Sequence, residues 1–313
     1  MLFSNVTVYQ ITRDLGLGEL TATDQLEERL KEFLFSPCTE QQLSKMGWVP
    51  PLHAHDGEGM HFFSEGRIML TLKREKKILP AAAIKKALDT KVSVIERETA
   101  RKVKKKEKDA LKEAIVQEML TRAFSKESYL NGYISLKDNL LVIDTATHSQ
   151  AEDFCALLRK TIGSLPVVPP QSNTSPDMMM TNWLQSQESP SGFVVGESAK
   201  LASPLEKGAK VTLKDQDLFT DEVLAHIETG QYVKEVRLEV VNSIDFTLTD
   251  CLQLKSVKWA DDIKLTQENS EQEDAIAKFD SDFVLMAGEL GNALSQLFSV
   301  MKVENPWEGD DVS

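Results

Sequence analysis

The amino-acid sequence predicts an α/β fold of the α+β type, in which mixed sheets carry a long helical arm. Three observations support this fold class. Strand-like and helix-like runs alternate in residues 1–75 and 130–170, residues 80–124 are helical without a strand, and both kinds of run return in the last third. The length of 313 residues corresponds to about two domains of ~150 residues each.

Residues 1–75 begin with a strand and a helix. Apolar and polar residues alternate over residues 6–11, which predicts a strand. Leucine and phenylalanine recur at helical spacing between residues 26 and 34, and Pro37 ends the expected helix. Residues 48–51, with the sequence WVPP, are expected to open a loop, and residues 67–72 are expected to form a second strand.

The character of the chain changes at Pro80, because proline is favoured in the first turn of a helix. An apolar stripe then predicts a helix, and its members are Ile84, Leu88, Val92 and Ile95. The run RKVKKKEKDALKE follows at 101–113, and a second amphipathic stretch covers 111–119. A helix that is polar on all sides cannot lie on a core, so residues 80–124 are predicted to project as a helical arm.

The pattern of strands and helices returns after the arm. Two apolar runs at 133–136 and 140–143 flank a polar turn and predict a hairpin. A helix with apolar residues between 154 and 162 follows it. Residues 171–192 are rich in Ser, Pro, Asn and Gln and are expected to be a linker or a long loop.

The last third of the chain is predicted to contain two helices and two strands. The helices cover 220–227 and about 273–301, and the strands cover 236–241 and 244–248. The expected division of the chain is a central α/β domain (1–76 and 127–170), a basic helical arm (77–126) and a C-terminal α/β domain (171–313).

Charge is distributed unevenly along the chain. The formal net charge is -13, which by itself argues against a nucleic-acid partner, since phosphates repel an acidic surface. Between Arg67 and Lys126, however, 18 Lys and Arg residues face 8 Asp and Glu residues. Residues 261–313 carry 13 acidic residues and 3 lysines. This asymmetry between segments predicts a basic surface on an acidic protein.

Several classes of protein and site are not supported by the sequence. It has no run of about 18 apolar residues and no basic segment before an apolar run at its N-terminus, so we expect neither a membrane partner nor a secretory signal. Cys38, Cys155 and Cys251 are scattered and odd in number, which indicates reduced thiols and a cytoplasmic location. The sequence also lacks a P-loop and a GxSxG motif, so we expect no catalytic residues and no cofactor.

One loop contains residues that could bind a metal. His53, His55 and His61 lie in HAHDGEGMH, and imidazole with nearby carboxylates could hold zinc. The spacing matches no structural zinc pattern, and an ordinary solvated loop explains the same residues. A hydrolase that uses this loop remains an alternative that bound metal would reveal, while our own expectation is that the protein has no metal site.

The basic segment is the strongest local indication of function. Its cations form two clusters, Lys73, Arg74, Lys76 and Lys77, and then Arg101, Lys102, Lys104, Lys105, Lys106 and Lys108. Such residues neutralise phosphates and release counterions, which drives binding that does not depend on sequence. The alternative is a solubilising helix face that Glu96, Glu98 and Glu107 balance. The net positive charge over sixty residues favours nucleic acid.

Phe124 lies about 40° outside the apolar arc that Leu111, Ile115 and Met119 centre on the second arm helix. It could fold back as the last core residue of that helix. Alternatively, it could project from the arm and pack into a partner subunit, where it would latch two chains together, or touch DNA. We favour the projecting position, because the polar stretch already indicates that the arm stands away from the body.

Distinctive stretches occur along most of the chain. They are FSPC (35–38), KMGWVPP (45–51), EKKILP (75–80), RKVKKKEKDALKE (101–113), RAFS (122–125), ALLRKTIGSLPVVP (156–169) and FDSDFVLMAGEL (279–290). KMGWVPP and LLRKTIGSLPVVP are long and unusual enough to be specific. Together these stretches resemble the RdgC family of bacterial recombination-associated proteins.

The resemblance implies more than composition does. It implies a crescent-shaped subunit that closes with a second copy into a ring-shaped homodimer around duplex DNA. The arms would meet at one side and the C-terminal parts at the other, with basic residues inside. Such proteins bind DNA, double-stranded and possibly single-stranded, with little sequence preference. They restrain RecA, have no known catalytic activity and would be found in the cytoplasm at the nucleoid.

One position departs from the family. Asp215 stands where relatives can carry a second basic residue, which weakens the expectation that Lys214 and Gln216 contact DNA. Trp48 and Trp183 are expected to be core or interface residues and not platforms for bases. An RNA-associated or ribosome-associated protein that uses the same basic arm remains the alternative function.

Overall fold

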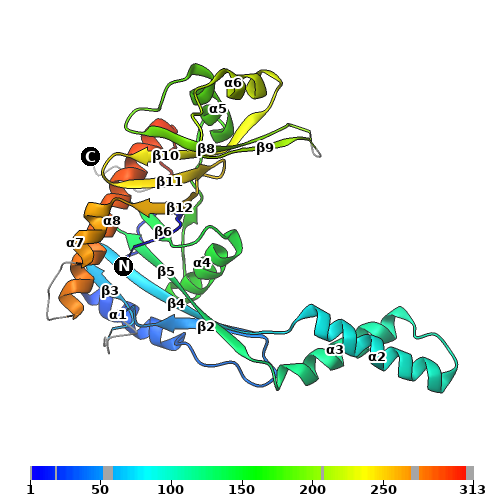
Figure 1. Cartoon of the computed structure of the whole chain (residues 1–313). Coiled ribbons are helices and arrows are strands. Elements are labelled where there is room, and N and C mark those ends of the chain that lie inside the picture. The colour runs from blue at the N-terminus through cyan, green and yellow to red at the C-terminus, as the bar shows by residue number, and fades with distance from the viewer. Residues whose placement is uncertain (1, 18–19, 52–58, 206–207, 269–274, 308–313) are drawn as a thin grey trace.

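The computed structural model describes residues 2–17, 20–51, 59–205, 208–268 and 275–307. Two antiparallel sheets lie one beyond the other, and a helical arm extends from the end of the first sheet (Figure 1). Together they form a crescent with an open hollow between the arm and the second sheet. The described residues contain eight α-helices, including a long C-terminal helix, so the fold is of the α+β type.

The first sheet has seven strands and carries two helices. Its strands are β1 (Thr7–Ile11), β2 (Ser44–Val49), β3 (Phe62–Ser64), β4 (Arg67–Lys77), β5 (Ser125–Ser135), β6 (Leu140–Ile143) and β7 (Val167–Val168). The order is β2-β4-β5-β6-β1-β7, and β3 also pairs with β4. Helices α1 (Leu20–Glu32) and α4 (His148–Ile162) contact each other. Leu26, Leu30, Trp48 and Phe154 share one core cluster there.

The second sheet has five strands and packs against the remaining helices. Its strands are β8 (Val194–Ala202), β9 (Lys210–Leu213), β10 (Tyr232–Val240), β11 (Ile244–Thr249) and β12 (Leu254–Trp259), in the order β12-β11-β10-β8-β9. The helices are α5 (Pro176–Ser186), α6 (Asp221–Glu228), α7 (Asp261–Glu268) and α8 (Ala275–Val300). Met180, Leu184 and Leu290 are fully buried in the core that these elements share.

Helix α8 joins the two sheets into one body. Phe283 on α8 contacts the rings of Phe62 and Tyr133 from the first sheet, at 6.2 and 5.8 Å between centroids. The same core cluster contains Phe246 and Leu248 of β11. By length and composition α8 could cross a membrane, but seven of its residues are buried in this core. The predicted boundary between residues 170 and 171 is therefore crossed by a continuous core.

The N-terminal residues also tie the sheets together. Val6 and Leu254 form an antiparallel bridge, and the Val257 amide donates to the Ser4 carbonyl at 2.8 Å. The indole of Trp259 donates to the Phe3 carbonyl, also at 2.8 Å. The first residues of the chain are thus held by its last strand.

The arm grows out of two long paired strands. β4 and β5 pair from Arg67 opposite Ser135 to Lys77 opposite Ser125, and they lead into α2 (Ala81–Thr99) and α3 (Lys105–Leu120) (Figure 1). α2 has no buried side chain, and α3 has two, Ile115 and Leu120. The expected projecting arm is confirmed.

Within the arm, the lysine-rich run at 101–113 was expected to be helical throughout, but its first residues form a turn between two helices. Helix α2 ends at Thr99, and Ala100 caps it with φ 50°. Residues 101–104 form the connection to α3, and Val103 is buried within it. The amide of Val103 donates to the Glu96 side chain at 3.0 Å. Turning the chain at this point allows the two apolar stripes to face each other.

Three other expectations were wrong. The sheets are not mixed, because every strand pair in the described residues is antiparallel. Residues 48–51 do not begin with a loop: Trp48 lies in β2, fully buried, and its indole donates to the Thr161 hydroxyl at 2.8 Å. The stretch 171–192 contains α5, which begins at Pro176 after Ser175.

Most of the other predicted elements are confirmed. They are the strand at 6–11, the helix between 21 and 36, the strand at 67–72, the hairpin at 133–143, the helix that ends at Ile162, the helix at 220–227, the strands at 236–241 and 244–248, and the terminal helix. β4 and β5 are longer than predicted, because their outer halves are polar and carry the arm. Strands β2, β3, β7, β8, β9 and β12 and helix α7 were not predicted.

Candidate nucleic-acid interface

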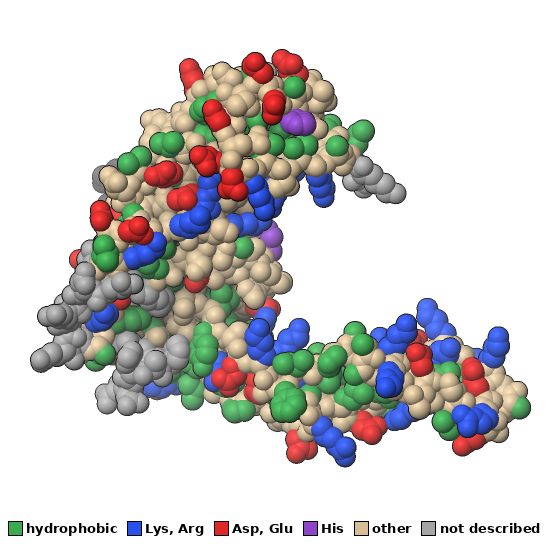
Figure 2. Space-filling model, viewed as in Figure 1, with side chains coloured by type: hydrophobic (Ala, Val, Ile, Leu, Met, Phe, Trp, Pro, Cys, Tyr) green, Lys and Arg blue, Asp and Glu red, His purple; other side chains and the backbone are tan. Residues whose placement is uncertain are grey.

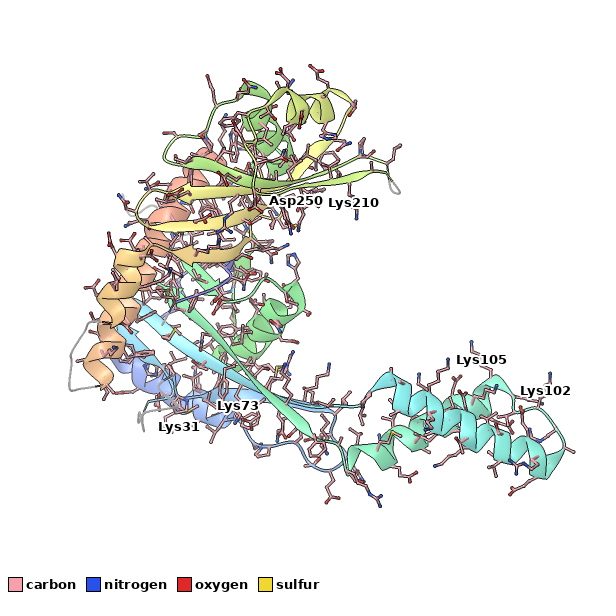
Figure 3. All side chains as sticks on the ribbon, in the orientation of Figure 1. Lys31, Lys73, Lys102, Lys105, Lys210 and Asp250 are labelled. Carbon is pink, nitrogen blue, oxygen red and sulfur yellow. The ribbon has the colours of Figure 1, made fainter. Side chains whose placement is uncertain are left out.

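Cations from two distant parts of the chain border the hollow of the crescent. Lys102 and Lys105 point from the arm toward the open side, and Lys210 on β9 points toward it from across the hollow (Figure 3). Blue side chains also gather over the second sheet and along the upper edge of the arm, while many acidic side chains lie on the outer surface (Figure 2). The hollow therefore has the electrostatic character that a polyanion requires.

The five lysines at the tip of the arm are available for binding. All of them are exposed, and within the described residues none makes an ion pair; they are Lys102, Lys104, Lys105, Lys106 and Lys108. Their ammonium groups repel one another in the isolated chain, because nearby like charges are unfavourable. Phosphates placed along the arm would remove that repulsion.

Arg101 serves the structure of the tip. Its guanidinium donates to both carboxylate oxygens of Glu107 at 2.8 Å. The Lys104 amide donates to the same carboxylate at 3.0 Å, at the N-terminus of α3. These hydrogen bonds lower the pKa of Glu107 to about 2. Arg101 therefore fixes the turn between the two helices.

The predicted cluster on β4 is divided by the alternation of the strand. Lys73 is paired with Glu127 at 2.8 Å and lies over the Phe35 ring, and Arg74 is paired with Asp153. Lys76 is exposed. Lys77, by contrast, is 8% exposed, and its ammonium donates to two carbonyls, of Glu40 at 2.6 Å and of Leu120 at 2.9 Å.

These contacts correct the role expected for Lys77. Its ammonium is enclosed between the segment that contains Glu40 and the end of α3, so it cannot reach a phosphate without breaking both hydrogen bonds. Leu120 is the last residue of α3, where a cation is favoured by the helix dipole. Lys77 therefore joins the arm to the body.

Lys214 and Gln216 follow β9 on the far side of the hollow. Lys214 is exposed and lines a groove on the second sheet, together with Lys200 and Lys255. Gln216 is partly buried, and its backbone amide donates to the backbone carbonyl of Glu197 at 3.3 Å. Asp215 between them has φ 52°, so the backbone turns sharply here. The two residues are separated by this turn, and only Lys214 belongs to the groove.

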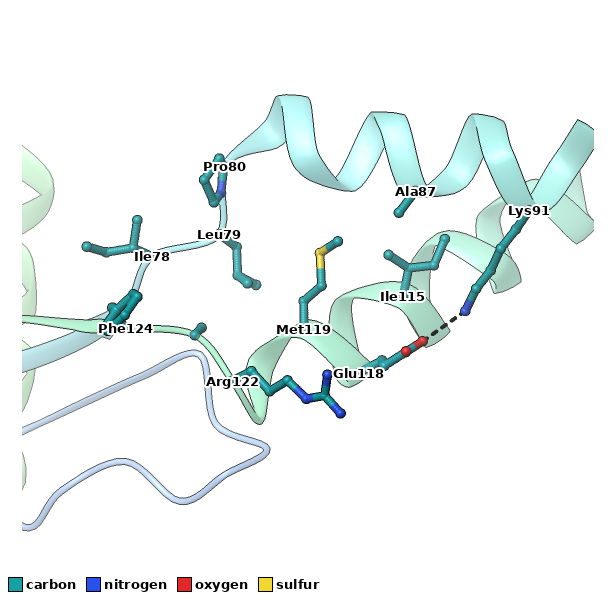
Figure 4. A pocket seen from close by; sticks show the side chains of 11 residues that line it. Ile78, Leu79, Pro80, Ala87, Lys91, Ile115, Glu118, Met119, Arg122 and Phe124 are labelled. Carbon is teal, nitrogen blue, oxygen red and sulfur yellow. Dashed lines mark hydrogen bonds and ion pairs between the residues drawn. The ribbon is translucent and has the colours of Figure 1, made fainter.

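Phe124 is 84% exposed at the root of the arm, which excludes the alternative of a core residue. Its carbonyl accepts a hydrogen bond from the Ile78 amide at 2.8 Å, where the two strands leave the body. Beside it lies a largely apolar pocket of about 460 Å³ that Leu79, Ile115 and Met119 help to line (Figure 4). A projecting phenylalanine and an apolar pocket thus lie side by side.

The sequence did not reveal the cations of the second sheet. Lys200 lies on β8, and Lys255 and Lys258 both lie on β12, two strands that were not predicted. The signal was present in the strand LKSVKW, where lysines point away from buried Leu254, Val257 and Trp259. These lysines are far from the lysine-rich run in the sequence, and only the fold brings them to the hollow.

Of the three histidines that could bind a metal, the structure describes only His61. His53 and His55 lie outside the described residues, and His61 Nδ1 lies 3.0 Å from Glu27 Oε2. In the described part of the chain, no group of three or more His, Cys, Asp or Glu side chains could hold a metal ion. Cys38, Cys155 and Cys251 are free thiols.

Comparison with known proteins shows that the chain matches one family. The family model described as "Putative exonuclease, RdgC" matches residues 1–304. Recombination-associated proteins RdgC of Proteus mirabilis and Yersinia enterocolitica are each 38% identical over 299 residues, 96% of this chain and 97% of theirs. That of Psychromonas ingrahamii is 40% identical over 290 residues, 93% of this chain and 94% of its own. With a family match that extends through the arm, both sheets and the whole of α8, this chain belongs to the RdgC family of recombination-associated proteins.

Proposed function

We propose that this chain binds duplex DNA without sequence preference, as a ring-shaped homodimer that surrounds the helix. The observation that carries the proposal is the hollow, to which the arm and the second sheet both present lysines (Figures 2 and 3). Non-specific DNA binding needs cations on a surface shaped to the backbone and does not need groups that read bases. The name of the relatives associates them with recombination, the process in which we expect this chain to act.

Charge distribution supports binding inside the hollow. The whole chain has a net charge of -13, so a DNA helix is repelled by most of the outer surface. The arm instead presents five exposed lysines without ion pairs among the described residues. DNA bound in the hollow would gain contacts with phosphates and release counterions.

The position of Phe124 supports ring closure. An 84% exposed aromatic beside an apolar pocket is self-complementary, because a two-fold dimer places the same patch of each chain against its partner. We propose that Phe124 of each chain enters the pocket of the other and latches the arms. The C-terminal domains, residues 171–313, form the second contact and complete the ring.

Encirclement suggests how recombination would be modulated. RecA acts on DNA, and a closed ring would occupy the duplex that RecA and its filaments need. The proposed effect is competition for DNA, with single-stranded DNA as a secondary ligand, in the cytoplasm at the nucleoid. The proposal requires neither a catalytic residue nor a cofactor.

The topology of the complex provides the test. A closed ring slides off an open DNA end but is retained on a covalent circle. At high salt, complexes preformed on linear DNA should therefore decay at least ~10-fold faster than complexes on nicked circles of equal length. Phe124→Ser should remove most of this difference and leave the melting temperature nearly unchanged, because exposed side chains contribute little to stability.

Two outcomes would reject the proposal. Equal decay from circles and linear DNA would show a surface binder without ring closure, and preference for RNA over duplex DNA in a competition assay would favour a ribosome-associated protein. Phe63→Ser is a matched control for Phe124→Ser and should leave retention on circles unchanged, since Phe63 is 47% exposed and does not line this pocket. A large fall in the melting temperature of Phe124→Ser would reject the latch.

A further inference from the structure

The C-terminal half of α8 borders a cleft that takes no part in the proposed DNA contacts. We call it the α8 cleft. It has a volume of about 410 Å³ and lies between the end of β1, the turn from β5 to β6, α8 and the segment after α8. Gln10 in its lining is buried, and the side-chain amide donates to the Glu304 carbonyl at 2.9 Å. Walls from both ends of the chain are thus held together by a hydrogen bond.

Gly291 leaves a gap in the wall of this cleft. It lies inside α8, where glycine is less favourable than any residue except proline. Packing does not require glycine here, because a Cβ would be 3.7 Å from the nearest side-chain atom, which is an ordinary contact. The two nearest atoms are Asp138 Oδ2 at 3.7 Å and Arg67 Nη2 at 4.0 Å. The gap therefore opens onto two side chains of opposite charge.

Arg67 is a buried cation that has little compensation. It is 3% exposed, and its Nε is buried without a hydrogen-bond partner among the described residues. Its ion pair with Glu65 is long, at 3.9 Å, and the Glu65 side chain is 65% exposed. A buried charge is costly unless it is paired and hydrogen-bonded. An acceptor that entered through the gap at Gly291 would supply the missing partner.

Asp138 supplies the opposite charge. Its Oδ2 accepts from the Ser135 hydroxyl at 2.6 Å, and the residue is exposed. Ser135 is the direct strand partner of Arg67, so the register of β4 and β5 fixes both charges. Within the described part of the chain, Asp138 and Arg67 make no ion pair with each other, although both border the same gap. A ligand in the gap must accept a hydrogen bond from Arg67 and donate one to Asp138.

The lining of the α8 cleft indicates the class of ligand. An α-amino acid meets both requirements of the gap, because its carboxylate is a charged acceptor and its ammonium group is a charged donor. Leu140, Phe298 and Val303 add apolar surface to the lining. The volume is in the range of sites for small molecules, which combine apolar walls with a few polar groups that fix orientation. The cleft therefore favours an amino acid with an apolar side chain.

We propose that the α8 cleft binds an apolar α-amino acid, with its carboxylate on Arg67 and its ammonium group on Asp138. None of the predicted DNA-binding residues is in the described lining, so the site is separate from the hollow. A ligand that binds only the folded state stabilises it, and here it would strengthen the contact between α8 and the first sheet. The proposal does not depend on DNA binding.

L-leucine is the probe that tests this site. A saturating concentration should raise the melting temperature of the full chain by at least ~2 °C, and calorimetric titration should show one site per chain. Acetate and methylammonium each carry only one of the two charges and should bind at least ~10-fold more weakly. Absence of both heat and a melting shift with L-leucine would overturn the proposal. Equal affinity for acetate would overturn it too, since a simple anion site would explain that result.

Gly291→Ala tests the gap with a variant that should fold well. Alanine is the better helix former, so the variant should melt at a higher temperature, while its Cβ fills the gap and weakens L-leucine binding at least ~10-fold. Gly288→Ala is the matched control in the same helix, because a Cβ there would meet nothing within 4 Å. It should gain similar stability and keep the affinity. Asp138→Asn should weaken binding as Gly291→Ala does. Unchanged L-leucine affinity in either Gly291→Ala or Asp138→Asn would overturn the proposal.

Discussion

The arm and the second sheet both carry lysines toward the hollow, but they do so by different means. In the arm, five lysines lie within seven residues, 102–108, at the tip of a helical hairpin. In the sheet, Lys200 and Lys258 are separated by 58 positions in the sequence, and strand pairing brings them to one face. Density of charge along the chain therefore reveals the arm, and only topology reveals the sheet.

The two regions also differ in what supports them. The lysines at the arm tip are all exposed, so substitutions there remove charge with little effect on packing. In the second sheet, β10 has Val236 and Leu238 fully buried, and Glu235 on the same strand pairs with Lys200 and Lys255. Arm lysines can therefore be replaced without a change in packing, whereas Lys200 and Lys255 belong to a network of ion pairs.

Reversing charge at the arm tip should produce the largest effect. Lys104→Glu/Lys105→Glu/Lys106→Glu should weaken duplex binding by at least ~100-fold at ~0.15 M salt, equally on unrelated sequences, because it removes up to three phosphate contacts per chain and adds repulsion. The melting temperature should stay nearly constant, since all three side chains are exposed. Fluorescence anisotropy with two duplexes of unrelated sequence measures the effect.

A neutral version of the same variant sharpens this test. With glutamine at the three positions, only the attraction is lost, and the affinity should be intermediate between those of the unmodified protein and the glutamate variant. An affinity that glutamate does not change would mean that the arm tip is only a solvated surface and that the sheet carries the binding.

Replacing Lys77 tests whether its hydrogen bonds at the base of the arm stabilise the protein. We expect a smaller effect than that of charge reversal at the arm tip. Lys77→Met removes the buried hydrogen bonds to the Glu40 and Leu120 carbonyls, and hydrogen bonds to charged groups contribute ~1.5–3 kcal/mol each. We expect the free energy of unfolding to fall by ~2–3 kcal/mol in urea denaturation. Lys76→Met, at the exposed neighbouring position, should stay within ~0.5 kcal/mol of the unmodified protein.

The pH response of the arm tip should be the smallest effect. Arg101 and the Lys104 amide lower the pKa of Glu107 from 4.5 to about 2. A lowered pKa in the folded state stabilises the fold above the unfolded pKa, and this contribution is lost as pH falls from about 4.5 to about 2. Amide hydrogen exchange at Val103 and Lys104 should therefore accelerate over that range, relative to the intrinsic rate.

Glu107→Gln is the matched variant for this measurement. It should accelerate exchange at the same amides already at neutral pH and make their protection nearly independent of pH. Identical pH profiles for the variant and the unmodified protein would show that the ion pair does not order the tip.

Much of the fold followed from local patterns. The stripe from Ile84 to Ile95 predicted α2, and alternation predicted β1, β10 and β11, because these periods are imposed by the geometry of one helix or strand. Helix α5 was missed because its sequence is rich in polar residues, although Met180 and Leu184 anchor it fully in the core. The loop expected at Trp48 was wrong because the two prolines lie just beyond the strand.

The candidate site was less predictable, since side-chain partners are set by tertiary contacts. Strand alternation places Lys76 and Lys77 on opposite faces of β4, but only tertiary contacts show which face is covered, here by the segment around Glu40 and the end of α3. Arg74 and Asp153 are separated by 79 positions and meet through the packing of α4 on the sheet. Phe124 was predicted to project from a helix, but α3 ends at Leu120, and Phe124 projects instead from the short segment between α3 and β5.

The attachment of the first residues to the last strand has a consequence for folding during synthesis. Val6 pairs with Leu254, and the Gln10 side chain donates to the Glu304 carbonyl at 2.9 Å, so these contacts form only when nearly the whole chain exists. At ~5–20 residues per second, the N-terminal strand would wait roughly 12–60 s for these partners. The two helices of the arm contact each other locally, and such contacts form fast. During synthesis the arm would therefore fold before the body closes.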